Sequence, residues 1–340
     1  MKQDLEFDVP FAAYINPRLA RVLPSHMDWL RAFDLLPAVG AEEEYLDWDF
    51  PSLSAWWWPN AEDEQLRLGL DIFGWLVIFD GQFDRSRGTD IDHATEFVNE
   101  LVHIARHPED PLPGYASPAA AAFKDVWDRE RADMLPHWQR RAALNWSKLF
   151  ESVVAETKNR VGSRIPDKVE YDRVRDDSGL MYVLLDASEL ICDCKVSLAV
   201  QKSPELQRMR LATVRGCNYI QDLFSVNKEE IQDDPNNIVF VLGNQNTLTR
   251  SESYRAAVAL VREITDDFLR AEARIPRMLD RLGASVEDRK ATYFLVDNMR
   301  ANFAAAYEWT RNSNRYTSSA RTREEQPGFL GDVGTRRLIS

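Results

Sequence analysis

The sequence is poor in cysteine, in long apolar runs and in the alternating patterns of β-strands. Its three cysteines, Cys192, Cys194 and Cys217, are an odd number in 340 residues, which argues against a disulfide framework. Cys192 and Cys194 would point to different faces of a helix, which weakens a zinc site, so we predict reduced thiols within the core. No apolar run approaches the length of a membrane span, and the N-terminus has no basic-plus-apolar signal pattern. A cytoplasmic location without a membrane span is therefore expected.

Positive charge is also scarce. The chain has 42 Lys and Arg against 55 Asp and Glu, a formal net charge of −13, which argues against nucleic acid as a partner. An anionic substrate would need local positive charge or metal ions. Of the five histidines, only His103 and His107 have the i, i+4 spacing of metal ligands, and no Glu follows His103 as a zinc-protease helix requires. We predict instead that they end a helix before Pro108.

Long amphipathic stretches dominate what remains. Proline and glycine are scattered, and neither a linker nor an internal repeat is evident, so we predict a single all-α domain over residues 1–340. Pro136 is expected to break or kink the helical pattern around it. The short patch Asn237–Leu242 is the one stretch with strand-like character. The predicted helical runs are Leu66–Phe79, Ala119–Leu135, His137–Glu156, Gly179–Val200, Leu206–Glu230, Tyr254–Leu282 and Val286–Tyr307.

Three oxygen-bearing side chains recur at helical spacing in one of these runs. Gln221, Ser225 and Glu229 stand at i, i+4 and i+8, so they share one stripe of an α-helix. An amide oxygen, a hydroxyl and a carboxylate are ligands for a hard divalent cation such as Mg²⁺. Lys228 lies beside them and is expected to bind an anion held next to the metal. The pattern predicts a magnesium–diphosphate site.

A second acidic element follows the apolar run that ends at Phe79. Asp80 and Asp84 are again i, i+4 and share a helix face. Two carboxylates at the end of a buried helix are costly without a cation, so we predict that both are metal ligands. The alternative is that Gly81 breaks the helix and that both carboxylates lie in solvent.

Four motifs in this order resemble those of bacterial class I terpene synthases. Asp80–Asp84 (DGQFD) is similar to their aspartate-rich motif, and Gln221–Glu229 (QDLFSVNKE) is similar to their second metal motif. Arg173–Gly179 (RVRDDSG) resembles the diphosphate-sensing arginine with the linker and effector residues that follow it. Trp309–Tyr316 (WTRNSNRY) resembles the C-terminal Arg-Tyr pair. The resemblance covers most of the chain and implies a helical bundle around a central active-site cavity.

The resemblance also implies roles for single residues. Arg175 would sense the diphosphate, Ser178 would be the linker, and Gly179 would be the effector whose carbonyl faces the nascent cation at a helix break. Arg315 and Tyr316 would donate hydrogen bonds to the diphosphate, as Arg175 would. Three Mg²⁺ ions are expected from the family.

The chain departs from the family pattern at two positions. Gly81 stands where a second Asp is usual, which removes a negative charge and loosens the helix end by about 1 kcal/mol relative to alanine. Gln221 stands where Asn is usual, and its longer side chain requires the metal or the helix to shift. Both departures bear on metal affinity and on the level of activity.

Aromatic side chains form the other part of the predicted site. A carbocation needs walls that stabilise charge without attacking it, and an aromatic face contributes about 0.5–2 kcal/mol. Leu76 and Val77 stand at two pocket-facing positions where family members often carry Phe, and smaller residues there favour a longer substrate. The aromatic residues predicted to line the cavity are Phe73, Phe79, Phe83 and Trp309.

These observations predict a class I terpene cyclase. It would use Mg²⁺ to ionise farnesyl or geranylgeranyl diphosphate and would cyclise the cation with release of diphosphate. One alternative is a chain-elongating prenyltransferase, against which the second motif with its Ser and Glu argues. Another is an isoprenyl-diphosphate-binding protein that has lost turnover, motivated by Gly81 and Gln221. The sequence leaves the oligomeric state open, with a homodimer as one option, and residues from about 320 to 340 are expected either to be flexible or to fold over the site.

Overall fold

The computed structural model describes residues 7–83, 91–317 and 337–338, and these residues are helical almost throughout, in agreement with the predicted all-α class. The two strands among them, β1 (Tyr115–Ala116) and β2 (Arg337–Leu338), form a short antiparallel pair. Of the predicted tail after residue 320, only β2 is described. The helices are α1 (Leu19–Ala32), α2 (Ala41–Asp47), α3 (Phe50–Trp57), α4 (Asp63–Phe83), α5 (Ile91–Arg106), α6 (Pro118–Arg131), α7 (Pro136–Val161), α8 (Lys168–Ser178), α9 (Met181–Ile191), α10 (Leu198–Gln201), α11 (Pro204–Gln232), α12 (Ile238–Asn246), α13 (Arg250–Glu272), α14 (Ile275–Arg281), α15 (Val286–Asn312) and α16 (Asn314–Thr317).

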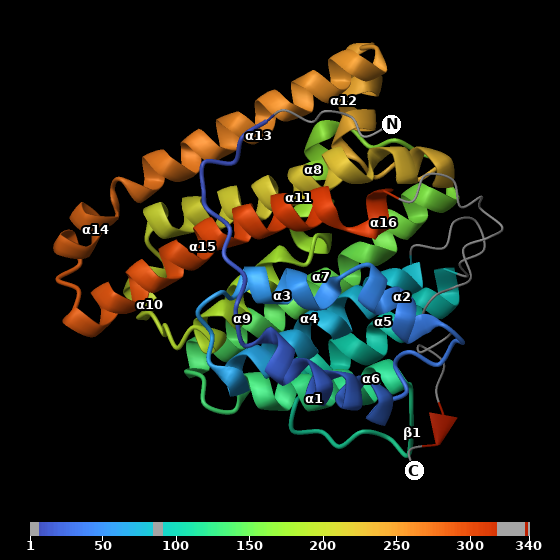
Figure 1. The fold of residues 1–340 in the computed structure, drawn as a ribbon, viewed down its shortest axis with the longest axis horizontal. Helices are drawn as coiled ribbons and strands as arrows, with labels where there is room; N and C mark the ends of the chain where they lie inside the picture. The colour runs from blue at the N-terminus through green and yellow to red at the C-terminus, as the bar shows by residue number, and fades with distance from the viewer. Residues whose placement is uncertain (1–6, 84–90, 318–336, 339–340) are drawn as a thin grey trace.

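Helix α4 lies at the centre of the lower half of the bundle in Figure 1. Every residue from Leu70 to Phe79 is buried, and all of them except Asp71 are apolar or glycine, as expected for a helix in the core. The Asp71 carboxylate pairs with Arg129 at 2.8 Å. Helices α1, α3, α6 and α9 pack against it. The long helix α11 lies in the upper half, where α13 and α15 pack against it (Figure 1).

Side-chain caps and prolines explain where many helices begin. Ser117, Ser203 and Ser285 each accept a hydrogen bond from the backbone N–H three residues later. Thr249 forms a reciprocal capping box at the start of α13. Pro136 is the first residue of α7, where a missing N–H costs nothing, so the predicted break at this proline is confirmed. Helix α5 ends at Arg106, as predicted for the segment before Pro108.

The strand-like patch Asn237–Leu242 was a wrong prediction, because it begins helix α12. The Asn237 side chain accepts the N–H of Val239 at 2.8 Å, which caps the helix. The Asp222 carboxylate accepts the N–H of Ile238 at 2.9 Å, which satisfies a second free donor. Capping therefore overrides the β-branched composition of the patch.

Two long predicted runs are each divided in the structure. The run Gly179–Val200 ends as α9 at Ile191, because Asp193 adopts a left-handed φ of 46° and α10 begins only after a Ser197 cap. The run Tyr254–Leu282 divides into α13 and α14, and Pro276 stands in the first turn of α14. Both breaks occur where a local backbone signal interrupts a continuous apolar pattern.

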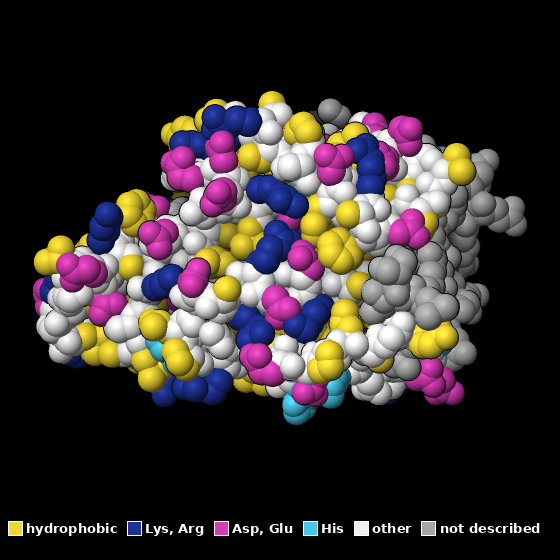
Figure 2. Space-filling view, turned by 90° about the horizontal axis from the view of Figure 1, so that it is seen from below, with side chains coloured by type: hydrophobic (Ala, Val, Ile, Leu, Met, Phe, Trp, Pro, Cys, Tyr) yellow, Lys and Arg dark blue, Asp and Glu magenta, His cyan; other side chains and the backbone are white. Residues whose placement is uncertain are grey.

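The cysteines are reduced, as predicted, and charged side chains are spread over the surface. All three cysteines are free thiols, with Cys194 and Cys217 buried and Cys192 half-buried. Acidic and basic side chains alternate with apolar ones on the face shown in Figure 2. Among residues 7–83, 91–317 and 337–338, none of the helices combines the length and apolar character that crossing a membrane requires.

Candidate functional site

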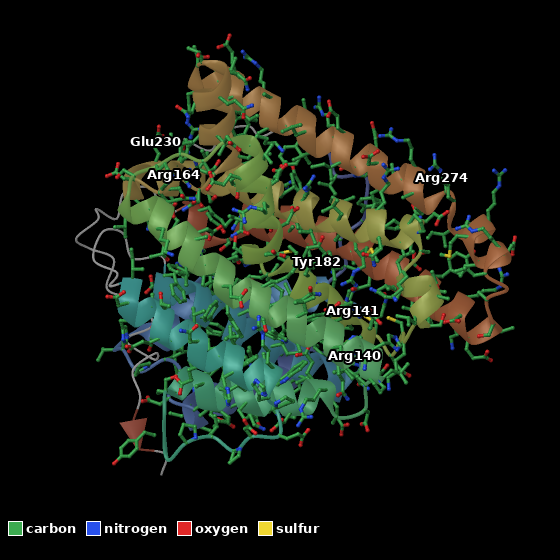
Figure 3. All side chains as sticks on the ribbon, turned by 180° about the vertical axis from the view of Figure 1, so that it is seen from behind. Arg140, Arg141, Arg164, Tyr182, Glu230 and Arg274 are labelled. Carbon is green, nitrogen blue, oxygen red and sulfur yellow. The ribbon has the colours of Figure 1, made fainter. Side chains whose placement is uncertain are left out.

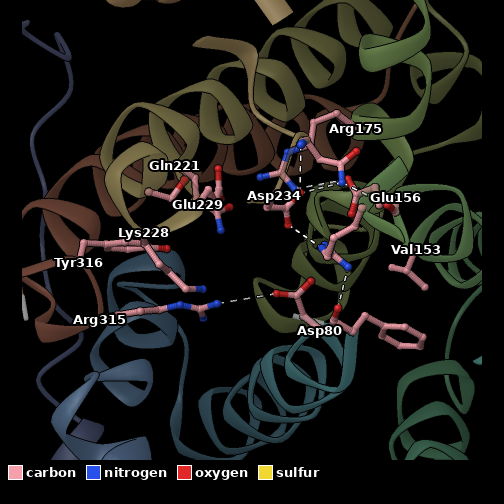
Figure 4. Close-up of a pocket in the computed structure, with 14 residues that line it drawn as sticks. Asp80, Val153, Glu156, Arg175, Gln221, Lys228, Glu229, Asp234, Arg315 and Tyr316 are labelled. Carbon is pink, nitrogen blue, oxygen red and sulfur yellow. Dashed lines mark hydrogen bonds and ion pairs between the residues drawn. The ribbon is translucent and has the colours of Figure 1, made fainter. Parts of the chain in front are cut away.

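A cavity opens where several helix ends meet (Figure 4). The C-terminal parts of α4, α7, α8 and α11 border it, together with the loop after α11 and the short helix α16. Helix C-termini carry partial negative charge, so this arrangement favours a bound cation. The lining residues are Asp80, Phe83, Val153, Glu156, Arg160, Arg175, Gln221, Ser225, Lys228, Glu229, Asp234, Asn236, Arg315 and Tyr316.

The predicted stripe on α11 faces this cavity. Gln221, Ser225 and Glu229 all line it, and so does Lys228. Glu229 accepts a hydrogen bond from Asn237 Nδ2 at 2.6 Å. Burial, and then the negative charges of Asp222 and Asp234, raise the pKa of Glu229 to about 8. A cation bound beside Glu229 would therefore stabilise its ionised form.

Asp80 belongs to the same cavity from the side of α4. Its Oδ2 lies 4.0 Å from an Arg315 guanidinium nitrogen, an ion pair drawn in Figure 4. The alternative in which Gly81 breaks the helix is wrong, because α4 continues through Gly81 to Phe83. Asp84, the second predicted ligand of this motif, lies outside the described residues. The structure thus brings Asp80 and the α11 stripe, which are far apart in sequence, to one cavity.

Arg175 stands in the last turn of α8 and enters the cavity opposite Lys228 and Arg315 in the view of Figure 4. Its guanidinium donates to Asp222 Oδ1 at 2.9 Å and lies 3.9 Å from Glu156. Asp222 also accepts the hydroxyl of Tyr171. These bonds fix the orientation of the arginine while it borders the cavity.

Arg315 and Tyr316 reach the cavity from α16. The Arg315 side chain is only 7% exposed, and its guanidinium lies over the rings of Trp48 and Phe50 at 5.3 and 5.5 Å. Trp309 supports this arrangement, because its Nε1 donates to the main-chain oxygen of Trp48 at 3.0 Å. Trp309 also meets the ring of Tyr316 edge to face, with ring centroids 5.6 Å apart.

The predicted helix break at the linker and effector positions is present. Helix α8 ends at Ser178 and α9 begins at Met181, with Gly179 and Leu180 between them. Ser178 donates its hydroxyl to the Glu156 carboxylate. Burial raises the pKa of Glu156 to about 7, although Arg175 and Ser178 act to lower it. Glu156 therefore connects the break to the lining of the cavity.

Most of the predicted apolar wall lies in the core. Phe83 lines the cavity, and the four other α4 residues of the predicted wall, Phe73, Leu76, Val77 and Phe79, are at most 6% exposed. Phe79 stacks on Trp75 with ring centroids 5.2 Å apart, and Phe73 meets Trp57 edge to face at 5.7 Å. A cavity-lining role for Phe73, Leu76, Val77, Phe79 and Trp309 stays a prediction.

Several lining residues were missed in the sequence. Arg160 on α7 donates to Asp234 at 2.7 Å and to the main-chain oxygen of Phe83 at 2.6 Å, so it joins the ends of α11 and α4. The one available signal was the i, i+4 spacing of Arg160 and Glu156, but the predicted helical run ended at Glu156, whereas α7 continues to Val161. Nothing local indicated Asp234 or Asn236, which reach the site through the turn after α11.

The donor set fits a hard divalent cation. The cavity contains four carboxylates (Asp80, Glu156, Glu229 and Asp234) and four basic groups (Arg160, Arg175, Lys228 and Arg315). A diphosphate brings several further negative charges, which this balanced set cannot offset without accompanying cations. Asp80, Gln221, Ser225 and Glu229 supply oxygen ligands of the kind that Mg²⁺ prefers. The arrangement can bind a metal–diphosphate complex.

Comparison with known proteins agrees with this chemistry. Residues 71–267 match the family model described as terpene synthase family 2, C-terminal metal binding. Pentalenene synthase of Streptomyces avermitilis is 29% identical over 98% of this chain and 99% of its own length. A 7-epi-alpha-eudesmol synthase of Streptomyces viridochromogenes, named as cyclising (2E,6E)-farnesyl diphosphate, is 26% identical over 94% of each chain. The crystal structure of linalool/nerolidol synthase from Streptomyces clavuligerus superposes with a TM-score of 0.80 at 25% identity, covering 90% of this chain and all of that one.

Proposed function

The chain belongs to terpene synthase family 2, and on this premise we propose that it is a class I terpene cyclase acting on farnesyl diphosphate. It would ionise the substrate, close the cation into a cyclic sesquiterpene and release diphosphate. The observation that carries the proposal is that Asp80, the α11 stripe and the cationic side chains of Arg175, Lys228 and Arg315 meet at one cavity. The C15 substrate is supported by the relative named for cyclising farnesyl diphosphate.

Asp80, Gln221, Ser225 and Glu229 would hold Mg²⁺, and Asp84 is proposed with them from the sequence. When bound, the metal supplies Lewis-acid neutralisation of the diphosphate charge. A complement of three ions is proposed from the family resemblance.

The basic residues would act on the leaving group. Arg175, Lys228 and Arg315 would donate charge-assisted hydrogen bonds to diphosphate oxygens, and Tyr316 would donate its hydroxyl. These bonds strengthen as the carbon–oxygen bond breaks and its electron pair leaves with the diphosphate, so they favour the transition state over the bound substrate. The Gly179 carbonyl at the helix break, positioned by the Ser178 linker, would face the allylic cation left behind. Apolar walls such as Phe83 would exclude water until the cation is quenched.

The decisive experiment is incubation of the purified protein with Mg²⁺ and either farnesyl or geranylgeranyl diphosphate. We expect metal-dependent diphosphate release from farnesyl diphosphate and a cyclic C15 product by gas chromatography–mass spectrometry. Preference for geranylgeranyl diphosphate would instead support the effect assigned to Leu76 and Val77 in the sequence.

Two other outcomes would overturn the proposal. Elongated products on addition of isopentenyl diphosphate would support a prenyltransferase. Tight binding without diphosphate release, even with Mg²⁺ in excess, would support a binding protein that has lost turnover. A homodimer and a cytoplasmic location stay proposals, and sedimentation in solution tests the first of them.

A further inference from the structure

Asn218 on α11 connects that helix to the break between α8 and α9. Its side chain is buried, and its Nδ2 donates to the main-chain oxygen of Arg175 at 2.9 Å. Its Oδ1 has no hydrogen-bond partner among the described residues. A buried amide oxygen without a hydrogen-bond partner is unfavourable in a core. A buried Asn at this position is therefore costly, and the bond from its Nδ2 to Arg175 is the feature that could offset the cost.

The next residue on the same face of α11 binds Arg175 as well. Asp222 follows Asn218 at i+4 and accepts a hydrogen bond from the Arg175 guanidinium at 2.9 Å. Asn218 therefore holds the main chain of Arg175 while Asp222 holds its side chain. The helix that carries the proposed metal ligands is tied at two points to the proposed diphosphate sensor.

Asn218 also explains the glycine at position 179. A Cβ atom on Gly179 would lie 2.1 Å from Asn218 Oδ1 and 2.3 Å from Nδ2, and the three nearest atoms all belong to the Asn218 amide. The backbone of Gly179, with φ −73° and ψ 12°, is one that any residue adopts. The close approach of Asn218, and not the backbone conformation, requires glycine here.

Leu180 shows that the break is held by its surroundings. Its φ is 68°, in the left-handed region that is unfavourable for leucine. Such a conformation persists only where neighbouring contacts over-determine it. The bond from Asn218 to the main-chain oxygen of Arg175 holds the last turn of α8, which leads into this residue.

We propose that Asn218 is a positioning residue, which fixes the helix break and its Gly179 relative to the metal-binding face of α11. The inference rests on the proposed function, because that function gives the break its part in ionisation and cation control. Without this bond the break would shift relative to the diphosphate. Ionisation would then slow, and more of the cation would be quenched before ring closure.

The test is Asn218→Leu, which keeps the branching at Cγ and the number of side-chain heavy atoms and removes the amide. Asn298→Leu is the matched control, because Asn298 is also buried, donates through Nδ2 to the main-chain oxygen of Trp57 at 2.7 Å, and has an Oδ1 without a hydrogen-bond partner among the described residues. Both variants should lose some thermal stability. At an assay temperature well below both melting temperatures, only Asn218→Leu should lower kcat, by between about tenfold and a hundredfold, with little change in KM. Only this variant should also raise the share of acyclic products. A kcat and a product ratio equal to those of the control would overturn the proposal.

A stability cycle tests the contact without any substrate. Gly179→Ala should lower the melting temperature strongly in the wild-type background and less in an Asn218→Ala background, because the second change removes the clashing amide. Equal losses of melting temperature in both backgrounds would show that Asn218 does not approach Gly179 closely. Absence of diphosphate release by the wild-type protein would overturn the proposed function, and with it the role of Asn218 in turnover, whereas this cycle would still decide whether the contact exists.

Discussion

At the residue scale, the acidic surroundings of Glu229 favour a bound cation beside its side chain. Its side chain is half-buried near two other acids, Asp222 and Asp234. Desolvation and these negative charges raise its pKa to about 8. Positive charge placed beside it would favour its ionised form, which is the form that binds a metal. The i, i+4, i+8 spacing was sufficient to predict this residue from sequence. The spacing could not indicate the acids around it, because Asp234 reaches the site only through the fold of the loop after α11.

Glu229→Gln keeps the shape of the side chain and removes its charge. We expect turnover to fall at least about a hundredfold, the scale typical of losing one preorganised electrostatic group, while the melting temperature is maintained. Glu230→Gln, on the exposed neighbouring residue, is the matched control. Steady-state rates at ordinary Mg²⁺ concentrations provide the measurement. Wild-type turnover in the Glu229 variant would remove this residue from the proposed metal site.

Asp80 and Gly81 give a second prediction at this scale. Because Asp80 borders the cavity and Gly81 continues the helix, Asp80→Ala should be much more harmful than Asp84→Ala. Gly81→Asp should leave activity equal or improved and lower the Mg²⁺ requirement, since it adds a carboxylate at a helical position. Mg²⁺ titrations of the three variants test this order. An Asp80→Ala protein that behaves like the wild type would contradict the use of the first motif.

At the scale of the elements, local signals predicted more than long-range ones. The apolar run of α4, the stripe of α11 and the start of α7 at Pro136 follow from periodicity and from proline. The start of α12 was missed although Asn237 caps it locally, because the β-branched residues of the patch were given more weight and the second capping bond comes from Asp222 in another helix. Arg160 was missed for the same reason, since its partners Phe83 and Asp234 come from two separate elements. Sequence periodicity identifies a helix face, and only tertiary packing decides what that face meets.

The two arginines proposed to bind the diphosphate, Arg175 and Arg315, belong to different elements, α8 and α16, and both border one cavity. The planar fork of arginine makes paired hydrogen bonds that lysine does not reproduce. Arg175→Lys and Arg315→Lys should therefore each impair turnover although the charge is kept. Each should also reduce the rise in melting temperature that Mg²⁺ plus diphosphate gives the wild type.

Arg164→Lys is a suitable control for this thermal-shift titration. Arg164 is exposed and pairs with Glu170 at the surface, where an ion pair contributes only about 0–1 kcal/mol. Ligand-induced shifts that stay unchanged in both site variants would exclude the two arginines from diphosphate binding.

At the scale of the whole molecule, a second charged cluster holds the bundle together away from the cavity. Asp186 on α9 accepts hydrogen bonds from Arg141 on α7 at 2.9 Å and from Arg210 on α11 at 2.5 Å, and Glu189 also pairs with both arginines. Figure 3 shows Arg141 on α7, away from the end of the bundle that carries Arg164 and Glu230. Removing one partner of such a buried pair typically costs about 3–5 kcal/mol. The cluster therefore fixes three helices in position while the site lies elsewhere.

Glu130 on α6 couples this region to pH. Its carboxyl is fully buried and accepts a hydrogen bond from Trp146 Nε1 at 3.0 Å. Burial raises its pKa from 4.5 to about 8, against the lowering effect of Trp146 and with a further rise from Asp186. A raised pKa means that the folded state binds the proton more tightly than the unfolded state. Its contribution to stability is therefore complete below about pH 4.5 and is lost as the pH rises through about 8.

Glu130→Gln replaces the protonated acid by a neutral group of the same shape. Wild type and variant should melt at similar temperatures near pH 5, and the variant should melt several degrees higher at pH 9, because it has no buried charge to create. Exposed Glu263→Gln controls for the loss of one carboxylate and should follow the wild-type curve. Calorimetric melting between pH 5 and 9 makes the comparison. If the melting temperatures of Glu130→Gln and wild type change in parallel with pH, Glu130 does not titrate with folding. If the variant is less stable than wild type at high pH, the ionised carboxylate of Glu130 stabilises the fold.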